Sequence, residues 1–205
     1  MVLNRKMKNT EEQIAEFVSN QPRGTLFFPD DFEHIGSSEA VRKALQRLEN
    51  KGTIRRVAHG IYVLPKESPY IGEVLPSAEG VAAAIAKRDK IRIVPTGVYA
   101  LHALGLSTQI PLRLVFLTDG TARTIKVGKR TIKLKRTTPK NLMAVGPISS
   151  LVIQALREIG KDKISPDELK QIMKILERED QQTLKHDIKL APEWIKQIMK
   201  GAIDG

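Results

Sequence analysis

The sequence predicts an α+β protein, with an N-terminal winged helix-turn-helix domain, an α+β domain with a mixed or antiparallel sheet, and a C-terminal helical tail. Three patterns lead to this prediction. Helical periodicity followed by a hairpin pattern comes first, short apolar strands occupy the middle, and amphipathic helices come last. We place the first domain at residues 1–66 and the second at 67–205, with an α/β core at 67–140 and the tail at 141–205.

The composition is that of a globular protein. Of 205 residues, 41% are hydrophobic and 28% are charged, so the chain can bury a core. It has no cysteine, which excludes disulfides, thiol catalysis, zinc ribbons and iron–sulfur clusters. No apolar run approaches the ~20 residues of a membrane span, and the basic N-terminus leads into acidic residues. We therefore expect a soluble cytoplasmic protein without a membrane partner.

Positive charge is concentrated in one part of the chain. The formal net charge is +11, and residues 87–140 contain 13 basic and only 2 acidic residues. Such a local excess favours an anionic partner, with nucleic acid ahead of an acidic protein or a membrane surface. The alternative is a basic face that contacts only solvent.

The first domain begins with a predicted helix, which Thr10 would cap and which Pro22 and Gly24 would end. A short helical turn at residues 30–34 follows. Ser37 then caps a helix over residues 38–51, and Gly52 ends it. The apolar residues of this last helix recur at i, i+3, i+4 and i+7 and therefore share one face; they are Val41, Ala44, Leu45 and Leu48.

Two short strands, residues 53–57 and 61–64, come next, and the loop of residues 58–60 joins them. Three helices followed by a hairpin are typical of a winged helix, whose third helix enters the major groove of DNA. Lys43 and Arg47 suit phosphate or guanine, whereas Gln46 and Asn50 suit adenine. The predicted DNA-binding residues are Arg42, Lys43, Gln46, Arg47, Asn50, Lys51, Arg55, Arg56 and His59. A protein-contact role is the alternative.

The second domain follows a polar connector at residues 66–76. We expect helices at 77–87 and 96–104, and strands at 91–94, 112–117, 123–127 and 130–136.

The last two strands form a hairpin that is half basic. Alternation directs Ile125, Val127, Ile132 and Leu134 to a core, and places Lys126, Lys133 and Lys135 outside. This surface suits a phosphate backbone or an acidic protein, although lysines also protect edge strands from aggregation. The basic residues of the hairpin are Arg123, Lys126, Lys129, Arg130, Lys133, Lys135 and Arg136.

The tail is predicted to be helical. A helix at 147–159 ends at Gly160, a capping box of Ser165 and Glu168 with Pro166 begins another, and a last helix starts at Pro192. Two roles are open for these helices. They cover the sheet, or the face with Trp194 binds a partner.

No catalytic pattern is complete. The run Gly128-Lys129-Arg130-Thr131 lacks both the first glycine of a phosphate-binding loop and a Ser or Thr directly after the lysine. The four histidines share no ligand spacing, and residues 87–140 lack a carboxylate cluster for a two-metal site. We therefore expect a protein that is not an enzyme and that needs neither a cofactor nor a metal.

One extended stretch carries a family resemblance. Residues 94–111 read VPTGVYALHALGLSTQIP, and the runs LTDG (117–120) and IKVGKRTI (125–132) follow. Together they resemble the AbiEi-like antitoxins of bacterial type IV toxin–antitoxin systems, which act in abortive infection. The resemblance covers about residues 10 to 160 and leaves the last helices unmatched.

The resemblance implies two activities. The winged helix would bind double-stranded DNA at the promoter of its own operon as an autorepressor, with residues 38–51 and 55–62 reading the DNA. Residues 77–160 would neutralise a cognate nucleotidyltransferase-like toxin, without requiring a stable complex. A transcription regulator with a small-molecule effector domain is the alternative, and a nucleic-acid-processing enzyme is a third reading.

Overall fold

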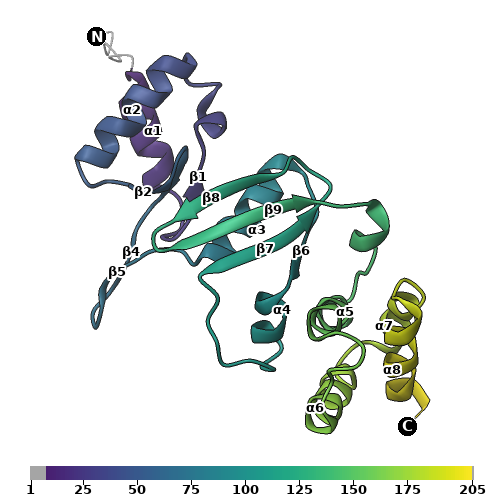
Figure 1. Ribbon diagram of the computed structural model, residues 1–205. Coiled ribbons are helices and arrows are strands. Elements are labelled where there is room, and N and C mark those ends of the chain that lie inside the picture. The colour runs from purple at the N-terminus through teal and green to yellow at the C-terminus, as the bar shows by residue number, and fades with distance from the viewer. Residues whose placement is uncertain (1–7, 205) are drawn as a thin grey trace, which may run out of the picture. The chain divides into compact units, whose positions relative to one another are not determined.

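The computed structural model (Figure 1) describes residues 8–204 and confirms the α+β fold. Backbone contacts divide the chain into two compact units, residues 1–81 and 82–205. The division falls later than the boundary after residue 66 that the sequence indicates, so two additional strands go with the first unit.

The first unit contains the expected winged-helix order of elements. A three-stranded antiparallel sheet with strand order β1-β3-β2 accompanies two helices and a 3-10 turn. The elements are α1 (Thr10–Ser19), β1 (Leu26–Phe27), η1 (Pro29–Phe32), α2 (Ser38–Asn50), β2 (Arg55–Ala58) and β3 (Ile61–Val63).

The caps of the two helices follow from their sequences. Ser37 caps α2 as predicted, because its side chain accepts a hydrogen bond from the backbone N–H of Ala40. The prediction that Thr10 caps α1 is wrong. Asn9 holds that position and forms a capping box with Glu12, in which each side chain accepts from the other's backbone N–H. Asparagine is as good a cap as threonine, so composition alone could not decide between neighbours.

The predicted apolar face of α2 lies in the core of the first unit. Val41, Ala44, Leu45 and Leu48 are at most 3% exposed. They pack in one cluster with residues from α1, η1 and the sheet, namely Ile14, Val18, Phe27, Phe32, Ile54, Tyr62 and Leu64. Burial of this face leaves the opposite side of α2 to solvent.

The predicted hairpin is present as β2 and β3, which we call the wing. Ala58 pairs with Ile61, so only His59 and Gly60 form the turn, and Ala58 belongs to the strand. Gly60 has φ +67°, a left-handed conformation that glycine adopts without steric cost.

The predicted polar connector at residues 66–76 is wrong, because it contains a second hairpin, β4 (Lys66–Ser68) and β5 (Gly72–Val74). Its three-residue strands are too short to show alternation in the sequence. The guanidinium Nε of Arg55 in β2 donates to both carboxylate oxygens of Glu73 in β5, at 3.0 and 2.9 Å. At the tip, Tyr70 and Ile71 are 93% and 75% exposed.

The second unit is built on a four-stranded mixed sheet with strand order β6-β7-β9-β8. β7 and β9 are parallel, and the other pairs are antiparallel. β8 and β9 have the bounds predicted from the sequence; the strands are β6 (Ile93–Thr96), β7 (Arg113–Thr118), β8 (Arg123–Val127) and β9 (Arg130–Arg136). One face of the sheet is buried, with Leu114, Phe116, Ile132 and Leu134 at most 3% exposed.

Two helices accompany the sheet, α3 (Ala78–Asp89) and α4 (Val98–Ala103). α3 crosses the division between the units and ends at Asp89, which ion-pairs with Arg123 of β8 on the buried face. β6 starts later than predicted and includes Pro95, which an edge strand tolerates because a proline there removes only an outward-facing donor.

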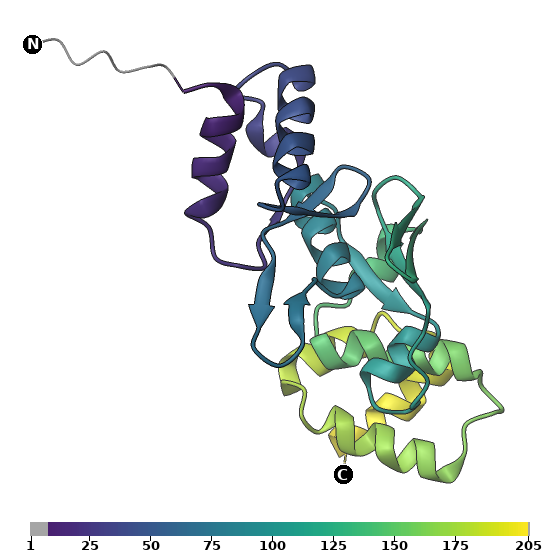
Figure 2. The ribbon, with the colours of Figure 1, turned by 90° about the vertical axis from the view of Figure 1, so that its left-hand side faces the viewer.

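The tail consists of η2 (Pro139–Leu142), α5 (Pro147–Ile159), α6 (Pro166–Leu176), α7 (Gln181–Ile188) and α8 (Glu193–Asp204). α5 and the capping box of α6 are confirmed. The four α-helices lie together in Figure 2 and share one apolar cluster, in which Val152, Ile172, Leu184 and Ile195 are buried. Sequence analysis missed α7, which is short and largely polar.

Two buried carboxylates hold the start of α5. Asp187 of α7 accepts hydrogen bonds from the backbone N–H groups of Val145 and Gly146 and from the Ser149 hydroxyl. Glu179 accepts from the backbone N–H groups of Ile148 and Ser149, both at 2.8 Å. The bonds to Glu179 satisfy two of the backbone donors that every helix N-terminus leaves free, and those to Asp187 hold the two residues that precede the helix.

None of the helices within residues 8–204 combines the length and the apolar character that crossing a bilayer requires.

Candidate nucleic-acid interface

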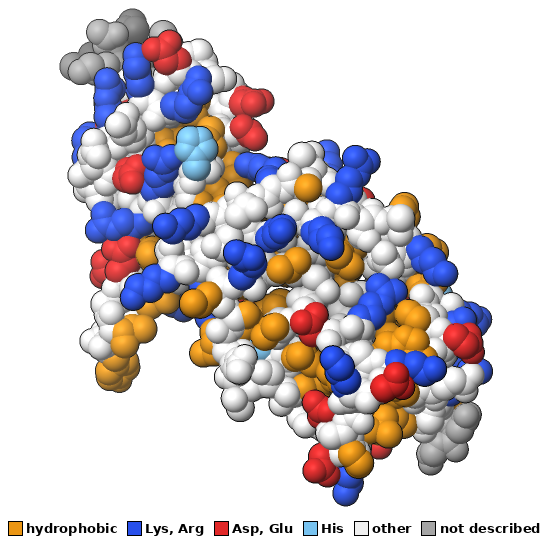
Figure 3. All heavy atoms as spheres, viewed as in Figure 1, with side chains coloured by type: hydrophobic (Ala, Val, Ile, Leu, Met, Phe, Trp, Pro, Cys, Tyr) orange, Lys and Arg blue, Asp and Glu red, His pale blue; other side chains and the backbone are white. Residues whose placement is uncertain are grey.

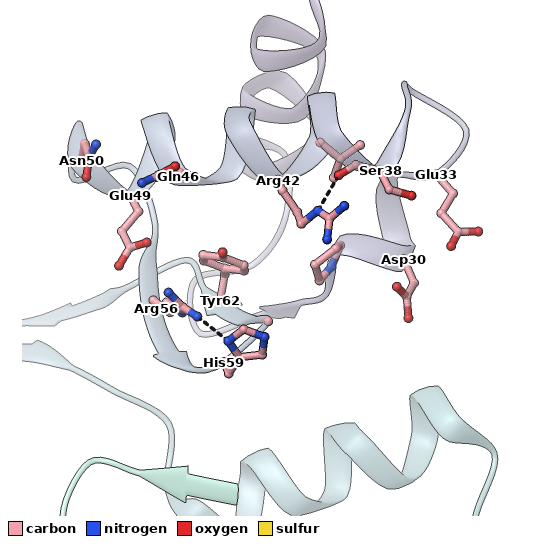
Figure 4. Close-up of a pocket in the computed structure, with 13 residues that line it drawn as sticks. Asp30, Glu33, Ser38, Arg42, Gln46, Glu49, Asn50, Arg56, His59 and Tyr62 are labelled. Carbon is pink, nitrogen blue, oxygen red and sulfur yellow. Dashed lines mark hydrogen bonds between the residues drawn. The ribbon is translucent and has the colours of Figure 1, made fainter.

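A groove of about 720 Å³ runs along the first unit between α2 and the wing (Figure 4). α2 forms one wall, the wing forms the opposite wall, and η1 closes one end. Its lining residues are Pro29, Asp30, Glu33, Ser38, Val41, Arg42, Gln46, Glu49, Asn50, Arg56, His59, Gly60 and Tyr62. Most of these are polar, as a surface that contacts nucleic acid must be.

Helical periodicity explains which side chains of α2 reach this groove. Arg42, Gln46 and Asn50 are spaced by four residues, so they follow one another along the helix opposite its buried face. All three are exposed. Five of the nine predicted DNA-binding residues therefore line one groove, since Arg56 and His59 of the wing join them.

The basic side chains in the groove are held by local hydrogen bonds. Arg42 Nε donates to the carbonyl oxygen of Ser38 at 3.0 Å, which leaves its other guanidinium nitrogens without a partner in the described residues. Arg56 Nη2 lies 2.8 Å from Nδ1 of His59 (Figure 4). Because a guanidinium only donates, this contact requires an unprotonated Nδ1 on His59.

The groove also contains acidic and phenolic groups that sequence analysis did not include. Asp30 and Glu33 lie at the η1 end, and Glu49 lies opposite the wing. Tyr62 is buried in the floor, and burial raises the pKa of its hydroxyl; Arg56 acts to lower that pKa and Glu49 to raise it. Spacing on α2 could have identified Glu49, because it follows Arg42 by seven residues on the same face.

Four of the predicted DNA-binding residues lie outside the groove, and each has a carboxylate partner. Lys43 Nζ is 2.7 Å from Glu39, one turn earlier on α2. Arg47 and Lys51 both contact Glu11 of α1, and Arg55 binds Glu73. The hydrogen bond from Lys51 lowers the pKa of Glu11. Burial acts to raise this pKa, and the positive charges of Lys51 and Arg47 act to lower it. None of these four cations lines the groove.

The second unit has an open, basic sheet face. Residues that are paired across neighbouring strands share a face, and the register places Lys126, Lys133, Lys135 and Arg113 on the side opposite the buried Leu114. All four are exposed, and none has a hydrogen-bond or ion-pair partner among residues 8–204. Blue side chains gather over this sheet in Figure 3.

The remaining basic residues of the hairpin lie elsewhere. Arg123 is opposite Leu134 and Arg130 is opposite Val127, so both belong to the covered face. Arg123 and Arg88 bind Asp89; burial acts to raise the pKa of Asp89, but these two hydrogen bonds outweigh it and the pKa is lowered. Lys129 is in the turn and Arg136 ends β9. Arg113, which sequence analysis did not include, takes the fourth place on the open face.

Two further groups have structural partners. Asp119 accepts a hydrogen bond from the backbone N–H of Arg92 at 2.9 Å, and His102 Nδ1 lies 3.3 Å from the carbonyl oxygen of Ser107. Within the described part of the chain, no group of three or more His, Asp or Glu residues is arranged to hold a metal ion.

Comparison with known proteins gives a family and a distant structural neighbour. No curated protein matches the chain. A crystal structure of the RV2827C protein from Mycobacterium tuberculosis aligns with a TM-score of 0.48 and 10% sequence identity, over 95% of this chain and 80% of that one. Residues 13–184 match the family described as "Family of unknown function (DUF6088)". Since the match spans both units and most of the sequence, the chain belongs to the DUF6088 family.

Proposed function

We propose that the chain is a sequence-specific double-stranded DNA-binding protein that uses the groove between α2 and the wing. The observation that carries the proposal is the convergence of Arg42, Gln46 and Asn50 from α2 with Arg56 and His59 from the wing on one exposed surface. A winged helix offers these same two elements to the major groove and to the adjacent backbone.

The residue types suit distinct contacts. The free end of Arg42 can donate two parallel hydrogen bonds to guanine O6 and N7, and the amides of Gln46 and Asn50 can pair with N6 and N7 of adenine. Arg56, from the wing, suits a backbone phosphate. Base contacts then come from α2, whereas the wing supplies position and affinity.

The resemblance to AbiEi-like antitoxins extends this proposal. The DNA bound would be the promoter of the protein's own operon, which makes the protein an autorepressor. The second unit would neutralise a nucleotidyltransferase-like toxin encoded beside it. The open sheet face supports a role for this unit in contact with an anionic partner, because its four unpaired cations have no carboxylate neighbour on that face.

Binding of the full chain to the duplex upstream of its gene tests the first part. We expect tighter binding to this duplex than to a scrambled one, with a log–log salt slope of about −0.9 per phosphate contact. Arg42→Ala and Gln46→Ala should each reduce the preference, whereas Lys174→Ala, at an exposed and unpaired position on α6, should not. Equal affinity for both duplexes would refute sequence-specific binding.

Co-expression with the neighbouring toxin gene tests the second part. The full chain should restore growth, and the triple variant Lys126→Ala, Lys133→Ala, Lys135→Ala should restore it less. The control triple variant, Lys161→Ala, Lys170→Ala, Lys174→Ala, removes the same charge from the helical tail and should act as the wild type. Failure of the wild-type chain to restore growth would refute the antitoxin activity, and equal rescue by both triple variants would exclude the sheet face.

A further inference from the structure

Glu49 is an unpaired carboxylate at the end of the groove that lies farthest from η1 (Figure 4). It lies on α2 seven residues, or about two turns, after Arg42. Its side chain is half-buried and points toward the wing in Figure 4. Among residues 8–204, no cation forms an ion pair with it and no donor bonds to its side chain. The other carboxylate of α2, Glu39, differs in this respect, because it forms an ion pair with Lys43.

Arg56, the arginine of the wing that lines the groove, does not pair with Glu49. Arg56 donates through Nη2 to His59 and through Nε to the carbonyl oxygen of Ala58, at 2.8 and 3.3 Å. Arg56 and Glu49 both act on the hydroxyl of Tyr62, so they share this part of the groove without forming an ion pair. The Glu49 carboxylate is therefore available to a donor from outside the chain.

Chemistry limits what such a carboxylate accepts from DNA. Phosphates repel it, and the major-groove edges of guanine and thymine present acceptors. Adenine offers one amino group beside the acceptor N7, whereas cytosine presents the N4 amino group alone. Cytosine is thus the base whose edge fits an ionised glutamate.

We propose that Glu49 is a specificity-determining residue that selects cytosine at one position of the DNA site. That position lies beside those read by Arg42 and Gln46, because the three side chains line the same stretch of α2. The inference rests on the proposed DNA binding. Positive charge alone attracts any DNA sequence, whereas Glu49 would require cytosine at one position. The carboxylate would favour the sequence with that cytosine and disfavour sequences with another base there.

Selection of duplexes from a randomised library by the full chain tests the inference. The wild type should enrich a site with one invariant cytosine. In Glu49→Gln the enrichment of cytosine over the other bases should fall roughly fivefold or more. This variant should favour adenine at that position, because a glutamine amide pairs with adenine N6 and N7. A damaged fold would not create a new preference. Glu39→Gln removes the same charge from the same helix outside the groove and should keep the cytosine.

The remaining outcomes separate the two proposals. If the wild type enriches a site and Glu49→Gln enriches the same one with higher affinity for all sequences, Glu49 only repels phosphates and the inference is wrong, while DNA binding stands. If the wild type enriches no sequence, the groove does not read DNA, and both proposals fail. Retention of a cationic peptide or protein by the wild type would then assign the groove's three carboxylates to that partner.

Discussion

Glu11 of α1 and Lys51 at the end of α2 are joined by an ion pair of 2.5 Å, and the same carboxylate contacts Arg47. Two residues that sequence analysis assigned to DNA binding, Arg47 and Lys51, are thus joined to one carboxylate on the neighbouring helix. These ion pairs bridge α1 and α2 at the surface, and they give both cations an anionic partner within the chain.

Replacing Glu11 by Gln should strengthen DNA binding. Arg47 and Lys51 would lose their carboxylate partner and could each contact a phosphate, so the salt slope should steepen by about 1 to 2 units. Binding of one duplex over a salt series measures this. Glu177→Gln, which removes an exposed charge at the end of α6, is the control and should leave the slope unchanged. An unaltered slope for Glu11→Gln would place this side of the winged helix away from DNA.

Asp187→Asn should destabilise the second unit by about 2 kcal/mol at pH 7, because the Gly146 backbone N–H and the Ser149 hydroxyl, both buried, lose an ionised acceptor. Burial acts to raise the pKa of Asp187, but the hydrogen bonds from Ser149, His186 and the backbone outweigh it and the pKa is lowered. A lowered pKa contributes stability above about pH 4 that is lost as the pH falls through the folded-state value.

Thermal unfolding at several pH values checks this sign. The difference between wild type and Asp187→Asn should be largest near neutrality and should shrink below about pH 4. Asp162→Asn, in the loop between α5 and α6, has an exposed side chain and serves as the control. A difference that grows in acid would contradict the assignment.

Lys90→Gly should stabilise the end of α3. Lys90 has φ +54°, and it occupies the C′ position of a Schellman motif in which its N–H bonds to Lys87 and the N–H of Ile91 bonds to Ala86. Glycine removes the strain of the left-handed conformation, which amounts to about 1–2 kcal/mol. Part of this gain is lost because glycine gives up more backbone entropy on folding than lysine does. We expect a net gain of about 0.5 kcal/mol. Lys90→Ala keeps the Cβ atom and should show no gain in the same denaturant titration.

Glu73→Ala should loosen the β4–β5 hairpin. The Arg55–Glu73 pair is partly exposed, so its loss costs about 0.5 kcal/mol, which corresponds to roughly a twofold rise in the open population. Chymotrypsin cleavage at the exposed Tyr70 reports this opening. Glu67→Ala, on the strand opposite Glu73, should cleave at the wild-type rate. Equal rates for both variants would mean that the wing does not restrain this hairpin.

Most of the fold could be predicted from local sequence patterns. The elements that sequence analysis missed depend on contacts with residues far away in the sequence. The apolar stripe of α2, the capping box at Ser165 and the bounds of β8 and β9 depend on residues a few positions apart, and all are confirmed. The β4–β5 hairpin depends in part on Arg55, and α7 depends on a cluster of four helices. Neither the hairpin nor α7 shows a hydrophobic periodicity in its own residues that would predict it.

The candidate site divides in the same way. Sequence analysis grouped Gln46 and Asn50 with Lys43 and Arg47. In the structure Gln46 and Asn50 line the groove, but Arg42 lies there in place of Lys43 and Arg47. Sequence analysis could not show that Arg47 faces Glu11 or that Arg123 faces Asp89, because those carboxylates lie 36 and 34 positions away along the chain. A count of basic residues in the sequence therefore overestimates the number of cations that are free to bind a partner.

The strand order of the second unit has a consequence for synthesis. β9 lies between β7 and β8, although it is made after both. While the chain leaves the ribosome, β7 can pair with β6 but has no neighbour on its other edge until β9 emerges. The backbone edge of β7 then stays unpaired during the interval in which β8 is translated, and an open strand edge invites pairing with another chain. The nascent protein should be most prone to aggregation, and most dependent on chaperones, in that interval.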